Sequence, residues 1–175
     1  MTYIVETSRL RLRNLRYDDA AFIVRLMNTP GWLAFIGDRD VRSEQAARAY
    51  LKDGPLKSYR ENGFGLCLVE TKDPVVSIGM CGILKRDTLD HPDIGFAFLP
   101  EYCGQGYARE IAGATVAWAQ DHLKLQKLLA ITRPDNHRSM ALLEHIGLKF
   151  VKRFVSPANQ EELLLYEINF DVHEK

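Results

Sequence analysis

The most constraining feature of the sequence is residues 93–110, which read as a strand, a glycine loop and the start of a long helix. The run is DIGFAFLPEYCGQGYARE. Gly104 and Gly106 allow the backbone to approach a ligand closely because no Cβ stands in the way. The first N–H groups of the helix have no partner within it, and its positive dipole end points into the loop. The segment therefore predicts an anion site, for which pyrophosphate is a typical ligand.

Strand and helix signals surround this segment. Apolar alternation and turn residues predict strands before and after it, and the short turn at 71–74 indicates an antiparallel hairpin. Besides the strand that opens the segment, strands are expected at 9–15, 64–69, 75–84, 128–132, 148–155 and 163–170. Helices are expected from Asp18 or Asp19 to Met27, and at 44–52, 106–123 and 136–146, with residues 29–43 forming a loop. The predicted order is βαα, three antiparallel strands, α, β, α, ββ.

Composition narrows the setting of the chain. With 175 residues it is expected to form one domain with a substantial core. The 23 basic and 23 acidic residues balance, so neither nucleic acid nor an anionic membrane is expected as a partner. The sequence has no apparent signal peptide or membrane span, and its three cysteines include no close pair. These features predict a cytoplasmic protein. A monomer or a homodimer is expected.

Two common phosphate sites fit the glycine loop poorly. A dinucleotide-binding loop needs a third glycine where Arg109 stands, and an acidic residue about 20 positions later. The region near Gln126 and Lys127 offers no such acid. A P-loop needs the pattern G-x-x-x-x-G-K-[ST], which does not occur in the chain.

A third pattern fits better. Residues 103–108, CGQGYA, resemble the acetyl-CoA loop of the GNAT superfamily of N-acetyltransferases. Residues 94–102, the run from Asn136 to Leu148 with Ser139, and the opening residues 7–13, TSRLRLR, are similar to its RimJ/RimL branch. The resemblance implies an α+β fold: a mixed, mostly antiparallel sheet of about seven strands with about four helices. It covers one domain at 7–171, with tails at 1–6 and 172–175.

The resemblance also implies a cofactor and its contacts. Acetyl-CoA would be the co-substrate, lying in a V-shaped gap between the strand of the opening segment and the strand after it. The backbone of Phe98 and Leu99 would bond the pantetheine arm. The implied contacts to the rest of the cofactor are Gly104, Gln105, Gly106, Tyr107, Ala108, Arg109 and Asn136. Arg109 and Asn136 have simpler explanations as a solvated arginine and a helix cap.

Two positions depart from the family pattern. Cys103 replaces Arg or Gln, and Leu148 replaces a common Phe. The first change has little effect on pyrophosphate binding, since backbone N–H groups supply most of the contact. A reactive thiol at Cys103 is an alternative interpretation, but no base stands near it in the sequence.

The chemistry requires a base for the amine and an acid for the departing thiolate. The tyrosine that often serves as the acid is replaced by Leu142 and Leu143. By resemblance, Ser139 becomes the candidate acid, although a serine at this position can simply cap the helix. Asp93 is the best-placed candidate base, with ordinary solvation of its carboxylate or a water chain as alternatives.

The five histidines show no metal-ligand spacing, so no metal is expected. Trp32, Phe35 and Ile36 form either a substrate wall or part of the core.

The leading hypothesis is transfer of an acetyl group to a primary amine, either a protein N-terminus or a small molecule. The missing tyrosine leaves open a non-catalytic acyl-CoA-binding or regulatory module. A nucleotide-binding oxidoreductase is the third alternative.

Overall fold

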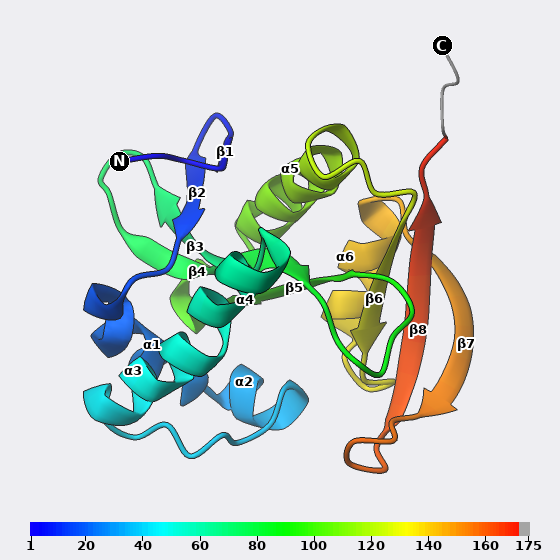
Figure 1. Ribbon diagram of the computed structural model, residues 1–175, viewed down its shortest axis with the longest axis horizontal. Helices are drawn as coiled ribbons and strands as arrows, with labels where there is room; N and C mark the ends of the chain where they lie inside the picture. The colour runs from blue at the N-terminus through cyan, green and yellow to red at the C-terminus, as the bar shows by residue number, and fades with distance from the viewer. Residues whose placement is uncertain (172–175) are drawn as a thin grey trace.

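The computed structural model describes residues 1–171, which form one eight-stranded sheet with helices on both faces (Figure 1). The strand order is β1-β2-β3-β4-β5-β6-β8-β7. The strands are β1 (Val5–Glu6), β2 (Leu10–Asn14), β3 (Leu66–Thr71), β4 (Ser77–Leu84), β5 (Asp93–Phe98), β6 (Lys127–Thr132), β7 (Lys149–Val155) and β8 (Glu162–Asn169). The α-helices are α1 (Ala20–Met27), α2 (Pro30–Phe35), α3 (Glu44–Asp53), α4 (Pro55–Asn62), α5 (Tyr107–Asp121) and α6 (His137–His145). Two 3₁₀ turns, η1 (Tyr17–Asp19) and η2 (Pro100–Tyr102), precede α1 and α5.

The prediction of a mixed, mostly antiparallel sheet is confirmed. Within the described residues, β5 and β6 are the one parallel pair of neighbours. The sheet has eight strands instead of about seven because Val5 and Glu6 pair with Leu12 and Arg11 of β2. Two residues are too few to produce a periodic pattern, so these positions were expected in a terminal tail. The other expected tail, 172–175, lies outside the described residues.

The region between β2 and β3 contains more helices than expected. The expected loop after α1 contains α2, which makes that part of the prediction wrong. Pro30 occupies the first helical position and the Thr29 hydroxyl accepts the N–H of Trp32, so both start signals are present. A six-residue helix is too short to show apolar periodicity. A further helix, α4, follows the expected break at Gly54 and Pro55.

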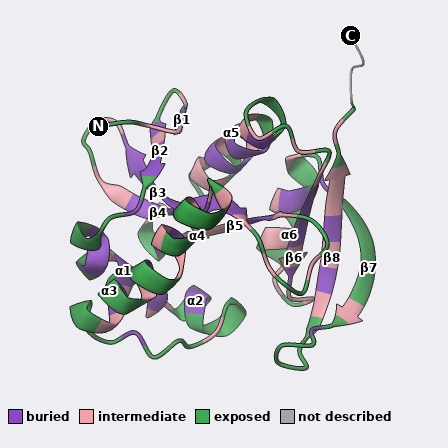
Figure 2. Cartoon of the chain, viewed as in Figure 1, coloured by how far each residue is buried: buried purple, intermediate pink, exposed green. Residues whose placement is uncertain are grey.

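Each face of the sheet has its own core (Figure 2). Helix α5 packs Ile111, Ala112 and Val116 on one face, where Leu143 of α6 joins the same cluster. Helices α1, α2 and α3 cover the opposite face around Ile23, Trp32 and Leu51. The sheet is thus sandwiched between two helical layers.

A buried ion cluster ties η1 to the sheet. The Arg13 guanidinium donates to both carboxylate oxygens of Asp19 at 2.9 Å and to Glu70 on β3 at 2.9 Å. All three side chains are buried. Burial opposes the charge, but the hydrogen bonds to Asp19 and Glu70 outweigh it and raise the pKa of Arg13. The Asp19 carboxylate also accepts the N–H of Arg16, so it fixes the entry into α1.

We expect Asp19→Ala to lower the free energy of unfolding by about 3–5 kcal/mol, because a buried guanidinium loses a bidentate partner. Urea denaturation followed by circular dichroism measures this loss. Asp18→Ala, at the exposed neighbouring position, is the matched control and should change stability by less than about 0.5 kcal/mol. Equal losses in the two variants would contradict a structural role for the cluster.

Candidate active site

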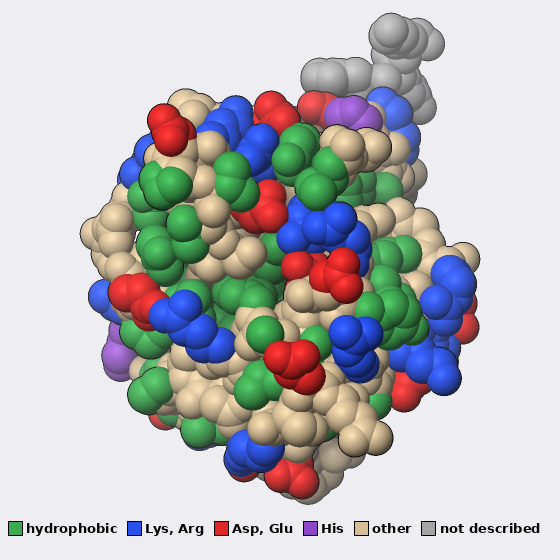
Figure 3. Space-filling view, turned by 90° about the vertical axis from the view of Figure 1, so that its left-hand side faces the viewer, with side chains coloured by type: hydrophobic (Ala, Val, Ile, Leu, Met, Phe, Trp, Pro, Cys, Tyr) green, Lys and Arg blue, Asp and Glu red, His purple; other side chains and the backbone are tan. Residues whose placement is uncertain are grey.

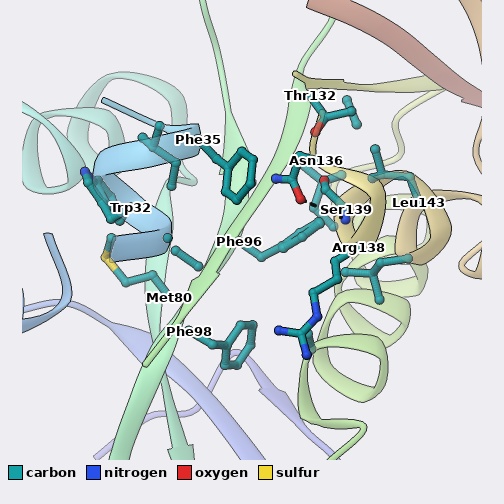
Figure 4. Close-up of a pocket in the computed structure, with 18 of the residues that line it drawn as sticks. Trp32, Phe35, Met80, Phe96, Phe98, Thr132, Asn136, Arg138, Ser139 and Leu143 are labelled. Carbon is teal, nitrogen blue, oxygen red and sulfur yellow. Dashed lines mark hydrogen bonds between the residues drawn. The ribbon is translucent and has the colours of Figure 1, made fainter. Parts of the chain in front are cut away.

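The site is built on a gap in the sheet. Strands β5 and β6 share a single register pair, Asp93 with Leu129, and the Leu129 N–H donates to the Pro92 carbonyl at 2.9 Å. Beyond this point the two strands have no paired residues, and a cavity of about 490 Å³ lies between them. The cavity is walled by α2 on one side and by the first turns of α5 and α6 on the other (Figure 4).

Strand β5 presents an open backbone edge to this cavity. The Leu99 N–H donates to Ile78, so its peptide points toward β4. Backbone direction alternates along a strand, so the N–H and C=O groups of Phe96 and Phe98 point the other way, toward the gap. Phe96 and Phe98 both line the cavity.

This geometry does not support Leu99 as a cofactor contact. Its N–H is used by Ile78, its carbonyl accepts the Tyr102 N–H at 3.0 Å, and its side chain is buried. Phe96 is the residue that the sequence reasoning missed. Strand alternation counted from Phe98 would have found it, because residues two apart share a backbone direction.

The glycine loop lies at one end of the gap. Gly104 and Gly106 have φ values of +77° and +81°, in the left-handed region that side chains other than glycine rarely adopt. Gly106 occupies the N-cap position of α5, and no side chain among residues 1–171 caps that helix. The first helical N–H groups, from Tyr107 onward, are therefore free to bind an anion.

The loop residues differ in how they meet the cavity. The lining includes Gly104, Gly106, Tyr107, Ala108 and Arg109. Gln105 is exposed and outside the lining, and its side chain donates to the Glu101 carbonyl at 2.9 Å. Its backbone remains part of the loop that the sequence predicts as the anion site.

Arg9, which precedes β2, contacts the backbone of the glycine loop and the first turn of α5. Its guanidinium donates to the Gln105 carbonyl at 3.0 Å and to the Glu110 carboxylate at 2.6 Å, and stacks 4.4 Å from the centre of the Tyr107 ring. The Thr7 hydroxyl donates to the same carboxylate at 2.6 Å. Burial opposes ionisation of Glu110, but the hydrogen bonds from Thr7 and Arg9 outweigh it and lower its pKa. Sequence reasoning did not assign this role because about 100 residues separate the partners.

The start of α6 forms the wall opposite α2. The Asn136 side-chain oxygen accepts the Ser139 N–H at 3.2 Å, so Asn136 is the helix cap. Within residues 1–171 the Ser139 hydroxyl makes no hydrogen bond, and Ser139 lines the cavity beside Asn136 (Figure 4). The capping alternative for the Ser139 side chain is therefore wrong. Arg138, which the sequence reasoning missed, also lines the cavity and extends toward Phe98.

Asp93 lies where β5 and β6 part. Its side chain is 1% exposed, and Arg86 Nε donates to both carboxylate oxygens at 3.0 and 3.1 Å. Burial raises the pKa of Asp93 to about 6, against the opposing effect of Arg86. The carboxylate thus titrates near neutral pH, where a general base is effective.

The remaining candidate residues occupy clear positions. Trp32 lines the cavity but is only 5% exposed, and it belongs to the core beneath α2. Phe35 and Ile36 are more exposed and line the cavity as well. Cys103 is exposed, and its thiol donates to the Leu99 carbonyl at 3.6 Å.

Residues 1–171 contain neither a metal-binding cluster nor a membrane-spanning helix. No group of three or more His, Cys, Asp or Glu side chains is arranged to hold a metal ion. No helix in this range has the length and apolar character to span a membrane.

The residues present fit acetyl-CoA in three respects. An uncapped helix start behind a glycine loop suits a diphosphate, the open edge of β5 suits an amide-bearing arm, and the cavity joins the two.

Comparison with known proteins agrees with this geometry. The family model described as "Acetyltransferase (GNAT) domain" matches residues 9–149, well over half of the chain. The protein named uncharacterized N-acetyltransferase YoaA of Bacillus subtilis is 24% identical over 148 residues, covering 83% of this chain and 82% of that protein.

Solved structures share the fold. An acetyltransferase from Agrobacterium tumefaciens superimposes with a TM-score of 0.80 at 23% identity, covering 97% of this chain and 95% of that one. RimL, a ribosomal L7/L12 alpha-N-protein acetyltransferase in complex with coenzyme A, gives a TM-score of 0.82 at 16% identity, covering 97% and 99% of the chains. The chain therefore belongs to the GNAT acetyltransferase family and is an acetyl-CoA-dependent acyltransferase.

Proposed function

We propose that this protein transfers the acetyl group of acetyl-CoA to a primary amine, by direct attack of the amine on the thioester. The observation that carries the proposal is the open edge of β5, with an uncapped glycine loop at one end and a buried carboxylate at the other. The acetyl thioester supplies the activated group. The chain supplies binding, orientation and proton transfer.

Donor binding uses the loop and the open edge. The free N–H groups at the start of α5 would hold the diphosphate, and the backbone of Phe96 and Phe98 would hold the pantetheine arm as an added strand. A free N–H on that edge would also stabilise negative charge on the thioester carbonyl during attack. Arg138 and Arg109 also line the cavity and would add positive charge near the phosphates.

Two side chains would manage the protons. The Asp93 carboxylate would accept the proton that the attacking amine loses, directly or through one water. The Ser139 hydroxyl, which has no protein partner within residues 1–171, would donate to the departing thiolate. The proposed base thus belongs to β5 and the proposed acid to α6.

The test of acetyl transfer mixes the protein with acetyl-CoA and a panel of primary amines. Release of the CoA thiol that depends on the amine, together with the acetylated amine by mass spectrometry, is expected. Acetyl-CoA binding without amine-dependent thiol release would contradict the proposal.

The assignment of Asp93 predicts a pH dependence. Below about pH 6 the carboxylate is protonated and cannot accept a proton, so kcat should fall on the acid side with an apparent pKa near 6. Asp93→Asn should remove this dependence and lower kcat by about 10²-fold or more. Asp90→Asn, an exposed acid in the preceding turn, is the control and should retain the profile.

Replacing Arg86, the partner of Asp93, should raise the pKa of the carboxylate further. Arg86 lowers the pKa of the carboxylate, so Arg86→Met should move the acid limb of kcat to higher pH. If the acid limb of kcat stays at the same pH in this variant, a group other than Asp93 controls it.

The loop assignment predicts a selective effect of Arg9. Arg9→Gln loses the contacts to Gln105 and Glu110, so the Kd for acetyl-CoA should rise about tenfold. Turnover of acetyl-pantetheine, which lacks the diphosphate, should stay unchanged. Arg153→Gln breaks a surface ion pair with Glu162 and serves as the control. Equal losses with both donors would point to a general structural role for Arg9.

Ser139 and Asn136 can be separated by substitution. Ser139→Ala keeps the N–H that Asn136 accepts, so kcat should fall by about 10²-fold without loss of stability. Asn136→Ala should instead lower the free energy of unfolding by about 1 kcal/mol, because it removes the cap. Thermal unfolding and steady-state kinetics measure the two effects, and a stability loss in Ser139→Ala would contradict its role as an acid.

A further inference from the structure

One side of the gap is basic and the other is apolar, and this difference limits which acceptor amines can bind. This inference rests on the proposed function. The anion-binding loop and the arginines Arg109 and Arg138 belong to α5 and α6, on one side. If the donor enters from that side, the amine must arrive from the side of α2. The residues that meet it there define the acceptor.

Strand β5 presents different residues to the two sides. Ile94, Phe96 and Phe98 pack with the α5 core, whereas Ala97 packs with the core beneath α2. Side chains alternate along a strand, so Asp93 and Ala97 share a face. The candidate base therefore lies on the face from which the amine would approach.

The α2 side of the cavity is apolar. Its lining comes from α2 and the residue after it, and from the sheet beneath: Trp32, Phe35, Ile36, Leu66, Met80 and Leu84. Phe35 is 37% exposed and Ile36 is 43% exposed. In Figure 4 the Phe35 ring projects from α2 into the space facing Asn136, whereas Trp32 points away. An apolar group on the acceptor could cover this exposed surface.

The same region has no free negative charge for a polycation. Among the described residues that line the cavity, Asp93 is the one carboxylate, and Arg86 neutralises it. Leu66 and Leu84 also line a second cavity of about 480 Å³ under α3 and α4. Its charged lining is balanced, with Arg39, Lys57 and Lys85 against Asp53, Glu61 and Asp87. Figure 3 likewise shows both signs of charge interspersed across one face of the molecule.

We propose that the acceptor is a primary amine whose nitrogen is attached to an aromatic or bulky aliphatic group and which carries no second positive charge. Phe35 and Ile36 would contact that group while the amine lies near Asp93. A free arylalkylamine and a peptide with an apolar first residue share this chemistry. A linear polyamine does not, since its further charges would lie against apolar side chains.

The test compares kcat/KM for thiol release across a matched panel. Phenethylamine and isoamylamine are the apolar monoamines, ethanolamine is the small polar amine and spermidine is the polycation. The apolar amines should exceed the other two by at least about tenfold, the discrimination that a hydrophobic pocket provides. Peptides that differ only in a first residue of Phe or Ser form a second arm, and the better of the two apolar sources identifies the acceptor type.

Two variants on the same helix locate the contact. Phe35→Ala should raise the KM for the apolar amine by about tenfold and leave the KM for acetyl-CoA unchanged. Leu33→Ala is the matched control, because Leu33 is 39% exposed on α2 but does not line the cavity. Equal effects of the two variants on amine KM would overturn the placement of the acceptor.

The outcomes separate this inference from the proposed function. Preference for spermidine or ethanolamine overturns the acceptor class while leaving acetyl transfer intact. No amine-dependent thiol release from any member of the panel overturns the proposed function itself.

Discussion

The site depends on the single register pair between β5 and β6. Within residues 1–171, every other neighbouring pair of strands has two or more paired residues, whereas β5 and β6 are paired in register only at Asp93 and Leu129. Each strand has another partner, β4 for β5 and β8 for β6, so both remain stable while they separate. Unpaired backbone groups at such an edge need a partner, which a ligand or water can supply. The gap therefore creates both the space and the unsatisfied groups that a bound arm can use.

Residues 7–13, in and just before β2, bind two distant parts of the molecule to the sheet. Arg9 and Thr7 hold Glu110 and the glycine loop, which belong to the α5 side. Arg13, on the strand itself, holds Asp19 and Glu70 and so ties the start of α1 to β3. The α5 side and the α1 side of the sheet are thus anchored through neighbouring residues of one segment. Arg9 supports the glycine loop, whereas Arg13 supports the packing of the start of α1 on the sheet.

Local patterns predicted most of the fold because they report local physics. Apolar runs bounded by turn residues placed β3 and β4 within a few residues of their observed bounds, and Asn136 signalled the start of α6. Short elements were not predicted, because α2 has six residues and β1 only two, fewer than a periodic signal needs. The sequence pointed to Leu99, whose N–H faces β4, and not to Phe96, because the direction of a backbone N–H depends on which neighbouring strand it pairs with.

By itself, the sequence determined the order of the longer elements, the glycine loop at the start of α5 and the resemblance to one acetyltransferase family. These depend on residue types at short spacing, where backbone preference and capping act directly. Only the tertiary structure decided that Asp93 is buried against Arg86 and that Arg9 holds the loop. Such contacts join residues distant in the sequence or depend on burial, and both arise only when the sheet and its two helical layers are assembled.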